Sequence, residues 1–314
     1  MKIVFFGTPD FAADIFLQLL DRGVEIAAVV TKPDKVKGRS GTPSPPPLKV
    51  AALQRAPQIP IYQPELASAP EFAASLAQHQ ADLFIVVAYG EIIKQHLLDM
   101  PKLGCINVHG SLLPKYRGAA PIQRCLIEGE SQTGVTIMHM VRKMDAGDII
   151  ELAKMDIPPD MTAAELEPAL RLLGAAALLE VIAEFERGVI RHIPQDASQV
   201  TYAAKIEQAD GEILWDRAAR QLHNLMRGVT PHPGAWCTVL LHGQVKRLKL
   251  FGSHFVAGVS GKPGQIMGYD AQGMLVACGS DGLRIAEVQP EGKRKMTAQE
   301  FILGYAVRHL TKPL

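Results

Sequence analysis

The segment CINVHGSLLPKYRGAAP, residues 105–121, carries the strongest structural signal in the chain. Its first half is an apolar run in which Asn107 and His109 are two residues apart, so on a strand both side chains leave by the same face. Gly110 ends the run, and a loop containing Pro114 and Gly118 follows. Because open α/β sheets bind ligands outside the carboxyl ends of their strands, we expect this amide and imidazole to face a ligand crevice.

A later carboxylate, Asp145, completes a set that suits acid–base chemistry. A single histidine at a strand end is more often structural than catalytic, and we interpret His139, for which the sequence offers no partner, in that way. An amide, an imidazole and a carboxylate together supply a donor for developing charge, a general acid and base, and a group that orients or charges the imidazole. Ser111 is the only near nucleophile candidate and has no evident pairing, which favours direct attack by a substrate nucleophile.

The segments around this motif predict an α/β fold with a mostly parallel sheet. Residues 2–6, 25–30 and 83–88 read as strands, and the last is apolar throughout, as in a strand buried on both faces. Helically spaced apolar residues between the first two strands favour a right-handed crossover. Gly-x-Gly-x-x-Gly is absent, so a dinucleotide cofactor has little support.

Beyond residue 207 the pattern changes to short apolar runs separated by glycine-containing turns. Five such runs, preceded by a helix at 216–227 and followed by one from 297 to about 305, suit a small five-stranded barrel of the oligonucleotide-binding type. The predicted organisation is a Rossmann-like catalytic domain at 1–189, a linker at 190–206 and an OB-like domain at 207–314. The five predicted strands are 236–241, 245–251, 265–267, 274–277 and 283–288.

Composition narrows the class of protein. Hydrophobic residues make up 47% and charged residues 21% of 314, as in ordinary globular proteins. No apolar stretch approaches the roughly 18 residues of a membrane span, and no signal peptide is evident. The four cysteines fit no metal-ligand spacing, so we expect no metal and a reducing, cytoplasmic setting. No long heptad pattern suggests assembly, which favours a monomer.

Charge is distributed unevenly along the chain. The net charge of +1 combines +4 for residues 207–314, from 13 Lys and Arg against 9 Asp and Glu, with −3 for the remainder, from 20 against 23. A basic C-terminal domain is compatible with nucleic-acid contact, although a solvated basic face is the commoner explanation.

The segment TKPDKVKGRSGTPSPPP, residues 31–47, is too rich in Pro, Gly and Lys for a regular element and predicts a surface loop. Two interpretations are open at this point. The loop is either a tolerated insertion or a basic segment that contacts the phosphates of RNA. Its basic side chains are Lys32, Lys35, Lys37 and Arg39.

The run N-V-H-x-S-L-L-P-x-Y-R-G-A-A-P and the segment M-D-x-G-D at 144–148 resemble the folate-dependent formyltransferases. The similarity extends over nearly the whole chain, through FFGTPDFA at 5–12, the insert, VVAYGEII at 86–93 and a distinct C-terminal domain. The resemblance implies formyl transfer from 10-formyltetrahydrofolate to the α-amino group of methionine on initiator tRNA. It assigns catalysis to Asn107, His109 and Asp145.

The same resemblance implies binding sites. It assigns the folate to the loop of Ser111, Leu112, Leu113 and Pro114 and to the turn of Tyr89 and Gly90, where backbone groups hold the pterin ring. It also implies that the insert closes on the acceptor end of tRNA. Lys35, Lys37 and Arg39 would then be its tRNA contacts.

Three alternatives share parts of this pattern. A formyltransferase acting on an amino-sugar nucleotide would have the same three catalytic residues without needing a basic insert or a basic C-terminal domain. A purine-pathway formyltransferase would end after the first domain. An inactive RNA-binding protein that kept the fold would be expected to have lost one of the three residues.

Overall fold

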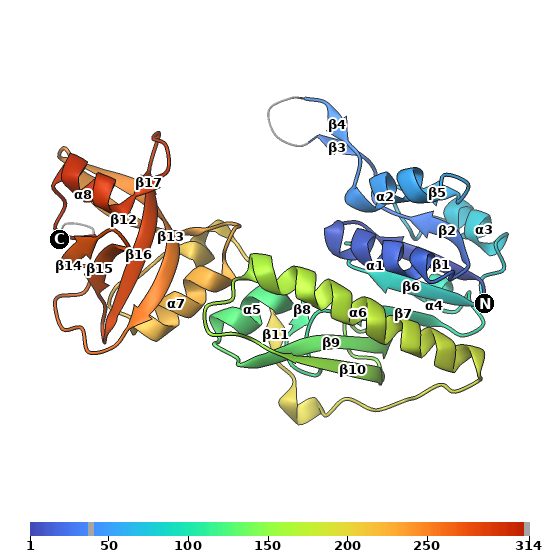
Figure 1. Ribbon diagram of the computed structural model, residues 1–314. Helices are drawn as coiled ribbons and strands as arrows, with labels where there is room; N and C mark the ends of the chain where they lie inside the picture. Colours follow the sequence, from blue (N-terminus) through green and yellow to red (C-terminus); the bar gives the residue numbers. More distant parts are fainter. Residues whose placement is uncertain (37–40, 311–314) are drawn as a thin grey trace. The chain divides into compact units, whose positions relative to one another are not determined.

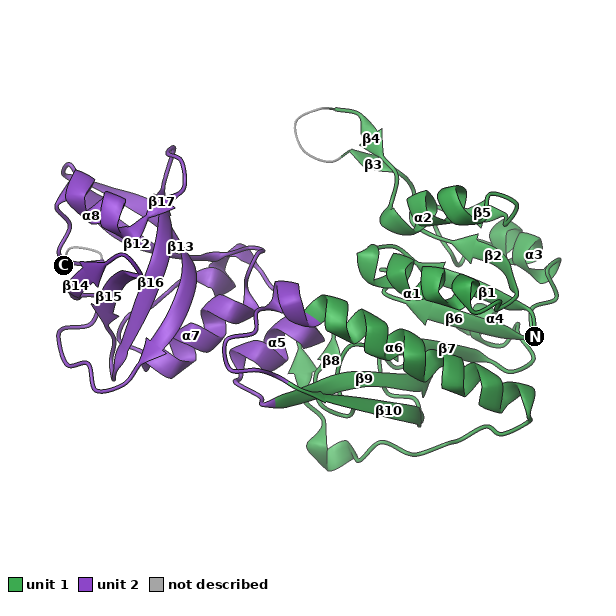
Figure 2. Cartoon of the chain, viewed as in Figure 1, with its two compact units in different colours: residues 1–118, 132–156, 167–203 green, residues 119–131, 157–166, 204–314 purple. Residues whose placement is uncertain are grey.

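The computed structural model describes residues 1–36 and 41–310 of the chain (Figure 1). Two compact units are present, each formed from three segments (Figure 2). Unit 1 comprises residues 1–118, 132–156 and 167–203, and unit 2 comprises residues 119–131, 157–166 and 204–314. The predicted organisation into a catalytic domain at 1–189, a linker at 190–206 and a tRNA-binding domain at 207–314 stays a prediction.

A seven-stranded sheet forms the centre of unit 1, in the order β10-β9-β7-β6-β1-β2-β5. The five strands from β7 to β5 are parallel, and β9 is antiparallel to both β7 and β10, so the predicted mostly parallel α/β sheet is confirmed. Its strands are β1 (Ile3–Gly7), β2 (Ile26–Val30), β5 (Ile61–Tyr62), β6 (Leu83–Val87), β7 (Cys105–His109), β9 (Gln132–His139) and β10 (Ile149–Asp156).

Helices pack on both faces of this sheet. Strand β6 is buried along its whole length, as its unbroken apolar sequence predicts. On one face Phe84 and Val86 pack in a cluster with Phe72 of α3 and Leu97 of α4. On the other face Gly174 of α6 lies against Val108 of β7. The helices are α1 (Asp10–Asp21), α2 (Pro47–Arg55), α3 (Pro70–Ala77), α4 (Gln95–Leu98) and α6 (Ala163–Glu186), with a 3-10 turn at Ala197–Gln199.

Three features of unit 1 differ from the prediction. Strand β10 was not expected, because its sequence IIELAKMD mixes charged and apolar residues; it forms the edge of the sheet, where one side is solvated. The insert contains a short hairpin, β3 (Lys35–Val36) with β4 (Pro43–Ser44), so a prediction of no regular element there was wrong. The predicted linker contains β11 (Tyr202–Ala203), which pairs in parallel with β8 (Arg117–Gly118).

Unit 2 is built around an antiparallel sheet in the order β12-β13-β16-β15-β14, with β17 paired to β16. All five predicted strands are present, and the helix predicted from 216 begins at Ala219. The strands are β12 (Ala235–Leu241), β13 (Gln244–Val256), β14 (Ile266–Asp270), β15 (Gly273–Ala277), β16 (Gly282–Pro290) and β17 (Met296–Thr297). The helices are α5 (Pro121–Ile127), α7 (Ala219–Gly228) and α8 (Ala298–Tyr305), with a 3-10 turn at Gln208–Gly211.

The sheet of unit 2 and its helices enclose a separate core. Leu222 of α7, Phe301 of α8 and Leu248 of β13 are fully buried in it. A closed oligonucleotide-binding barrel would join the two ends of the sheet, whereas the strand order observed in the described residues ends at β12 and β14. The antiparallel β unit is therefore confirmed, and its barrel closure stays a prediction. In the part of the chain that is described, no helix has the length and apolar character needed to cross a membrane.

Candidate active site

Strand β7 positions the first two predicted catalytic residues. Asn107 lies opposite Met138 of β9 and His109 opposite Thr136, so the two side chains share a face of the sheet, as their spacing predicts. His109 ends the strand and is buried, with 6% of its surface exposed. The side-chain amide of Asn107 is half-buried and forms no hydrogen bond with another described residue. It is therefore free to donate to a ligand.

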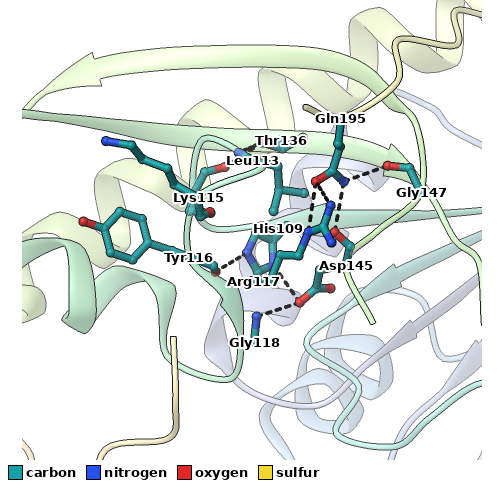
Figure 3. Close-up of polar contacts among 11 residues, drawn as sticks. His109, Leu113, Lys115, Tyr116, Arg117, Gly118, Thr136, Asp145, Gly147 and Gln195 are labelled. Atoms are coloured by element: carbon teal, nitrogen blue, oxygen red, sulfur yellow. Dashed lines mark hydrogen bonds and ion pairs between the residues drawn. The ribbon is translucent and has the colours of Figure 1, made fainter. Parts of the chain in front are cut away.

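The imidazole of His109 is held between two oxygens (Figure 3). Its Nε2 lies 3.0 Å from the carbonyl oxygen of Tyr116, so Nε2–H donates and Nδ1 carries the lone pair. Nδ1 lies 3.8 Å from Oδ2 of Asp145. Burial lowers the pKa of His109, while the Asp145 charge and the Tyr116 carbonyl oppose this shift. The ring is neutral at pH 7, with its unprotonated nitrogen toward the carboxylate.

Asp145 is fixed in an unusual backbone conformation. Its φ of 51° lies in the left-handed region, which among non-glycine residues asparagine and aspartate adopt most readily. Its Oδ2 accepts a hydrogen bond of 2.8 Å from the amide of Gly118. Two residues later, a side chain at Gly147 would collide with the carbonyl oxygen of His139, so the loop packs tightly against the end of β9. The structure thus brings His109 and Asp145 together.

The loop after β7 is braced from β9. The hydroxyl of Thr136 donates to the carbonyl oxygen of Ser111 at 2.6 Å and accepts from the amide of Leu113 at 3.0 Å. The hydroxyl of Ser111 is fully buried and donates to the carbonyl oxygen of Lys115 at 2.8 Å. Leu113 is also buried, whereas Leu112 and Pro114 are half-buried. Ser111 therefore shapes the loop, and its engaged hydroxyl agrees with a reaction that uses no enzyme nucleophile.

Tyr89 and Gly90 follow the carboxyl end of β6, the strand next to β7. The ring of Tyr89 is buried edge-on against Phe6, and its carbonyl oxygen accepts from the hydroxyl of Thr8 at 2.8 Å. Gly90 is exposed and has a φ of 86°. Its amide N–H donates to no other residue within the described ranges. Of the two, Gly90 offers open backbone to a ligand and Tyr89 supports the turn.

The basic residues of the insert have different surroundings. Lys35 lies on β3 and is exposed. Lys37 and Arg39 lie outside the described residues. Lys32 is half-buried, forms an ion pair of 2.5 Å with Glu91 and lies over the ring of Tyr89. Its contact with phosphate stays a prediction, and in this structure its charge is paired with Glu91 beside the turn after β6.

Sequence reasoning missed Gln195, which lies in the predicted linker. Its side-chain amide donates to the carbonyl oxygens of Asp145 and Gly147, and its oxygen accepts from the guanidinium of Arg117. The PQD sequence at 194–196 reads as an ordinary linker, so only the fold reveals this contact. His139 also gains a partner, since its Nε2–H donates to the carbonyl oxygen of Arg191 at 3.0 Å.

Unit 2 carries a surface hollow of about 710 Å³ on strands β12, β13 and β16. The guanidinium of Arg247 stacks 4.1 Å from the ring of Trp236 in its wall. Lys249, which is exposed, and Lys246, which is half-buried, also line the hollow, and neither forms an ion pair with another described residue. Glu212 and Glu291 lie in the same wall. Among residues 1–36 and 41–310, no cluster of His, Cys, Asp or Glu has the geometry to hold a metal ion.

Both parts of the chain match known family models. Residues 1–182 match the formyl transferase model, and residues 205–306 match the model of the formyl transferase C-terminal domain. The chain therefore belongs to the formyl transferase family. Among its relatives, the methionyl-tRNA formyltransferase of Protochlamydia amoebophila (strain UWE25) is 52% identical over 99% of this chain and 97% of that protein.

Solved structures share the fold at lower identity. HypX from Aquifex aeolicus, in complex with tetrahydrofolic acid, aligns with a TM-score of 0.65 at 17% identity. The match covers 100% of this chain but 49% of HypX, so the chain spans about half of that protein. WlaRD, a sugar 3N-formyl transferase with dTDP and 5-N-formyl-THF, also aligns with a TM-score of 0.65, at 19% identity over 94% of this chain and 99% of that one.

Proposed function

We propose that the protein transfers the formyl group of 10-formyltetrahydrofolate to the α-amino group of methionyl-initiator tRNA. The observation that carries the proposal is the neutral His109, whose free Nδ1 faces the carboxylate of Asp145. Asn107, two residues before His109 on the same strand, has a side-chain amide that no other described residue engages. Full-length similarity to a methionyl-tRNA formyltransferase selects this reaction from those that the site can perform.

Each of the three side chains has a distinct task. Attack of a neutral amine on the formyl carbon forms a C–N bond and an oxyanion; the bond to the folate nitrogen then breaks, with one proton lost by the amine and one gained by the leaving nitrogen. Asn107 donates its amide N–H to the oxyanion. His109 accepts the amine proton at Nδ1, which is possible because burial keeps the ring neutral. Asp145 then stabilises the imidazolium through its charge.

The site suits a folate. The exposed Gly90 has an amide N–H with no acceptor in the described chain, as expected where backbone holds a pterin ring. Leu112 and Pro114 offer partly exposed apolar surface after β7, while Ser111, Leu113 and Tyr89 fix the backbone around them. A folate bound here supplies the activated formyl carbon.

A tRNA acceptor is favoured over an amino-sugar nucleotide by unit 2. Lys246 and Lys249 are unpaired cations beside the stacked Trp236 and Arg247, a combination suited to phosphates and to a base or ribose edge. We assign Lys35, Lys37 and Arg39 of the insert to the acceptor end of the tRNA. The four cysteines are free thiols, which suits the reducing cytoplasm in which translation takes place.

The test is a formylation assay with 10-formyltetrahydrofolate and three acceptors: methionyl-initiator tRNA, methionyl-elongator tRNA and an amino-sugar nucleotide. Product on the initiator tRNA alone is the expected result. Product on the sugar nucleotide alone would preserve the chemistry and reject the tRNA acceptor. Binding of tRNA with no product on any acceptor would favour an inactive RNA-binding protein.

A further inference from the structure

We infer that Gln195 is a positioning residue for catalysis, which holds the Asp145 carboxylate toward His109 by fixing the backbone of the loop that carries it. The inference rests on the proposed function, because it gives Asp145 a role in formyl transfer. Gln195 itself contacts neither Asp145 Oδ2 nor the imidazole, so its action is on their geometry.

The first observation is the conformation of Asp145. Its φ of 51° lies in the left-handed region, which aspartate adopts more readily than most non-glycine residues but less readily than the right-handed or extended regions. The interaction of Asp145 with His109 spans 3.8 Å, longer than a hydrogen bond, so it depends on where the loop places the carboxylate. A small rotation of the loop would separate the two groups.

The second observation is the complete use of the Gln195 amide (Figure 3). Its Nε2 donates to the carbonyl oxygen of Asp145 at 2.9 Å and to that of Gly147 at 2.7 Å. Its Oε1 accepts from Nε and Nη2 of Arg117 at 3.1 and 2.6 Å. Both amide hydrogens and the oxygen are therefore engaged, and the carbonyl groups on either side of Ala146 are tied to one side chain.

The third observation is the location of Arg117. Its side chain is 94% buried, and its two chain neighbours contact the catalytic pair directly. The carbonyl oxygen of Tyr116 accepts from His109, and the amide of Gly118 donates to Asp145. The segment 116–118 contacts both His109 and Asp145. Gln195 connects this segment, through Arg117, to the backbone of the loop that carries Asp145.

Two substitutions separate the parts of this contact. Gln195→Glu keeps an acceptor for Arg117 but cannot donate to the two carbonyl oxygens, and Gln195→Met removes both interactions without adding charge. We expect kcat to fall by on the order of 100-fold in both, as small displacements of catalytic groups produce. KM for either substrate should stay within about 2-fold. Gln199→Ala, on an exposed glutamine of the same segment, is the matched control.

A second readout is independent of turnover. In the full-length protein labelled with ¹⁵N-histidine, the His109 resonance is followed by NMR during a pH titration and identified by its loss in His109→Gln. The Asp145 charge raises the pKa of His109, so its displacement in Gln195→Met should lower the titration midpoint relative to wild type. Apart from that carboxylate, His109 is contacted by the Tyr116 carbonyl, which carries no net charge.

The outcomes distinguish the inference from the function. An unchanged His109 midpoint in Gln195→Met, or full activity in Gln195→Glu, would overturn the positioning role. A loss of kcat that only parallels a fall in melting temperature would assign Gln195 to folding. A wild-type protein without formylation activity would reject the proposed function, and the NMR titration would still decide whether Gln195 holds Asp145 toward His109.

Discussion

Asp145 acts on His109 through its charge, since the two groups are 3.8 Å apart. Asp145→Asn keeps an oxygen for the Gly118 amide and removes only that charge. We expect kcat to fall by about 100-fold or more, because the imidazolium formed during the reaction loses its stabilisation. The acid limb of the kcat/KM profile should move to lower pH, because the pKa of His109 falls further without the carboxylate.

Initial formylation rates from pH 5.5 to 8.5 measure both effects. Asp148→Asn is the control, since Asp148 lies in the same turn but pairs with His192 at the surface, and its activity should remain within about 2-fold of wild type. The affinity for tRNA, measured by filter binding, should be the same in both variants. An Asp145→Asn enzyme with normal kcat would remove Asp145 from the mechanism.

His223 of α7 gives unit 2 a pH-dependent stability. The ring is 99% buried; its Nδ1 lies 2.9 Å from the hydroxyl of Ser253, and its Nε2 lies 3.1 Å from Asp160. Burial lowers the pKa of His223, with Arg227 and Arg220 acting in the same direction and the Pro159 carbonyl and Asp160 opposing them. Below the unfolded value of about 6.5 the unfolded chain therefore binds a proton that the folded chain does not.

Stability should consequently decrease as the pH falls from 7.5 to 5.5, and level off once the folded His223 is also protonated. Over this interval the melting temperature of wild type should fall further than that of His223→Gln, by about 2 °C or more. In a chain of this size, 1 kcal/mol of stability corresponds to roughly 2–4 °C in melting temperature. Calorimetry at the two pH values measures the difference. His96→Gln, at an exposed histidine, should keep the wild-type slope; a wild-type slope in His223→Gln would contradict the assignment.

At the scale of elements, helix α6 supports β7, the strand that carries Asn107 and His109. A Cβ at Gly174 would lie 3.3 Å from Val108 of β7 and 3.4 Å from Val135 of β9. We expect Gly174→Ala to be nearly neutral, because the gain in helix propensity offsets a small steric cost. Gly174→Leu should destabilise the protein by about 1–3 kcal/mol through overpacking.

The same displacement of β7 would move Asn107 and His109, so Gly174→Leu should also lower kcat. Urea denaturation and the formylation assay measure the two effects. Leu172→Ala changes a residue of α6 whose side chain is exposed. It should change the free energy of unfolding by no more than about 0.5 kcal/mol and kcat by no more than about 2-fold. Wild-type stability in Gly174→Leu would show that α6 can shift without disturbing the sheet.

The sequence predicted best those elements whose pattern of apolar residues follows directly from the burial of the element itself. β6 and β7 are apolar and central; β6 was predicted at 83–88 and is observed at Leu83–Val87, and β7 ends at His109, directly before the predicted stop at Gly110. β10 was missed because an edge strand carries Glu151 and Lys154 on its partly solvated sides. His139 lacked a predictable partner because Arg191 is 52 residues away, and Gln195 reaches Asp145 across 50 residues. Such contacts depend on how the chain folds back, which no local pattern encodes.

At the scale of the whole molecule, chemistry and RNA affinity are assigned to different side chains. In the proposed mechanism Asn107, His109 and Asp145 act on bonds and protons, whereas the proposed role of the cations around the hollow in unit 2 is to bind phosphates. Substitutions in the first group should change kcat, and those in the second should change KM for tRNA. Combined substitutions should multiply, since each affects a separate step.

Charge reversal at Lys246 and Lys249 tests the second half of this division. Lys249 is exposed and Lys246 is half-buried, and neither is paired among the described residues, so each can release a counterion from tRNA when it binds a phosphate. In Lys246→Glu/Lys249→Glu we expect tRNA to bind about 10-fold or more weakly at low salt. The slope of log affinity against log salt should decrease in magnitude by about 2, one for each lost phosphate contact.

The turnover number at saturating tRNA should remain within about 2-fold of wild type, because neither lysine takes part in the transfer of the formyl group. Lys262→Glu, an exposed lysine of unit 2 that does not line the hollow, provides the same charge change as a control and should shift affinity far less. Equal losses from the control would mean that net charge alone attracts tRNA. An unchanged salt slope in the double variant would show that the phosphates are bound elsewhere on the protein. The hollow with its Arg247–Trp236 stack would then be an ordinary solvated surface without a role in tRNA binding.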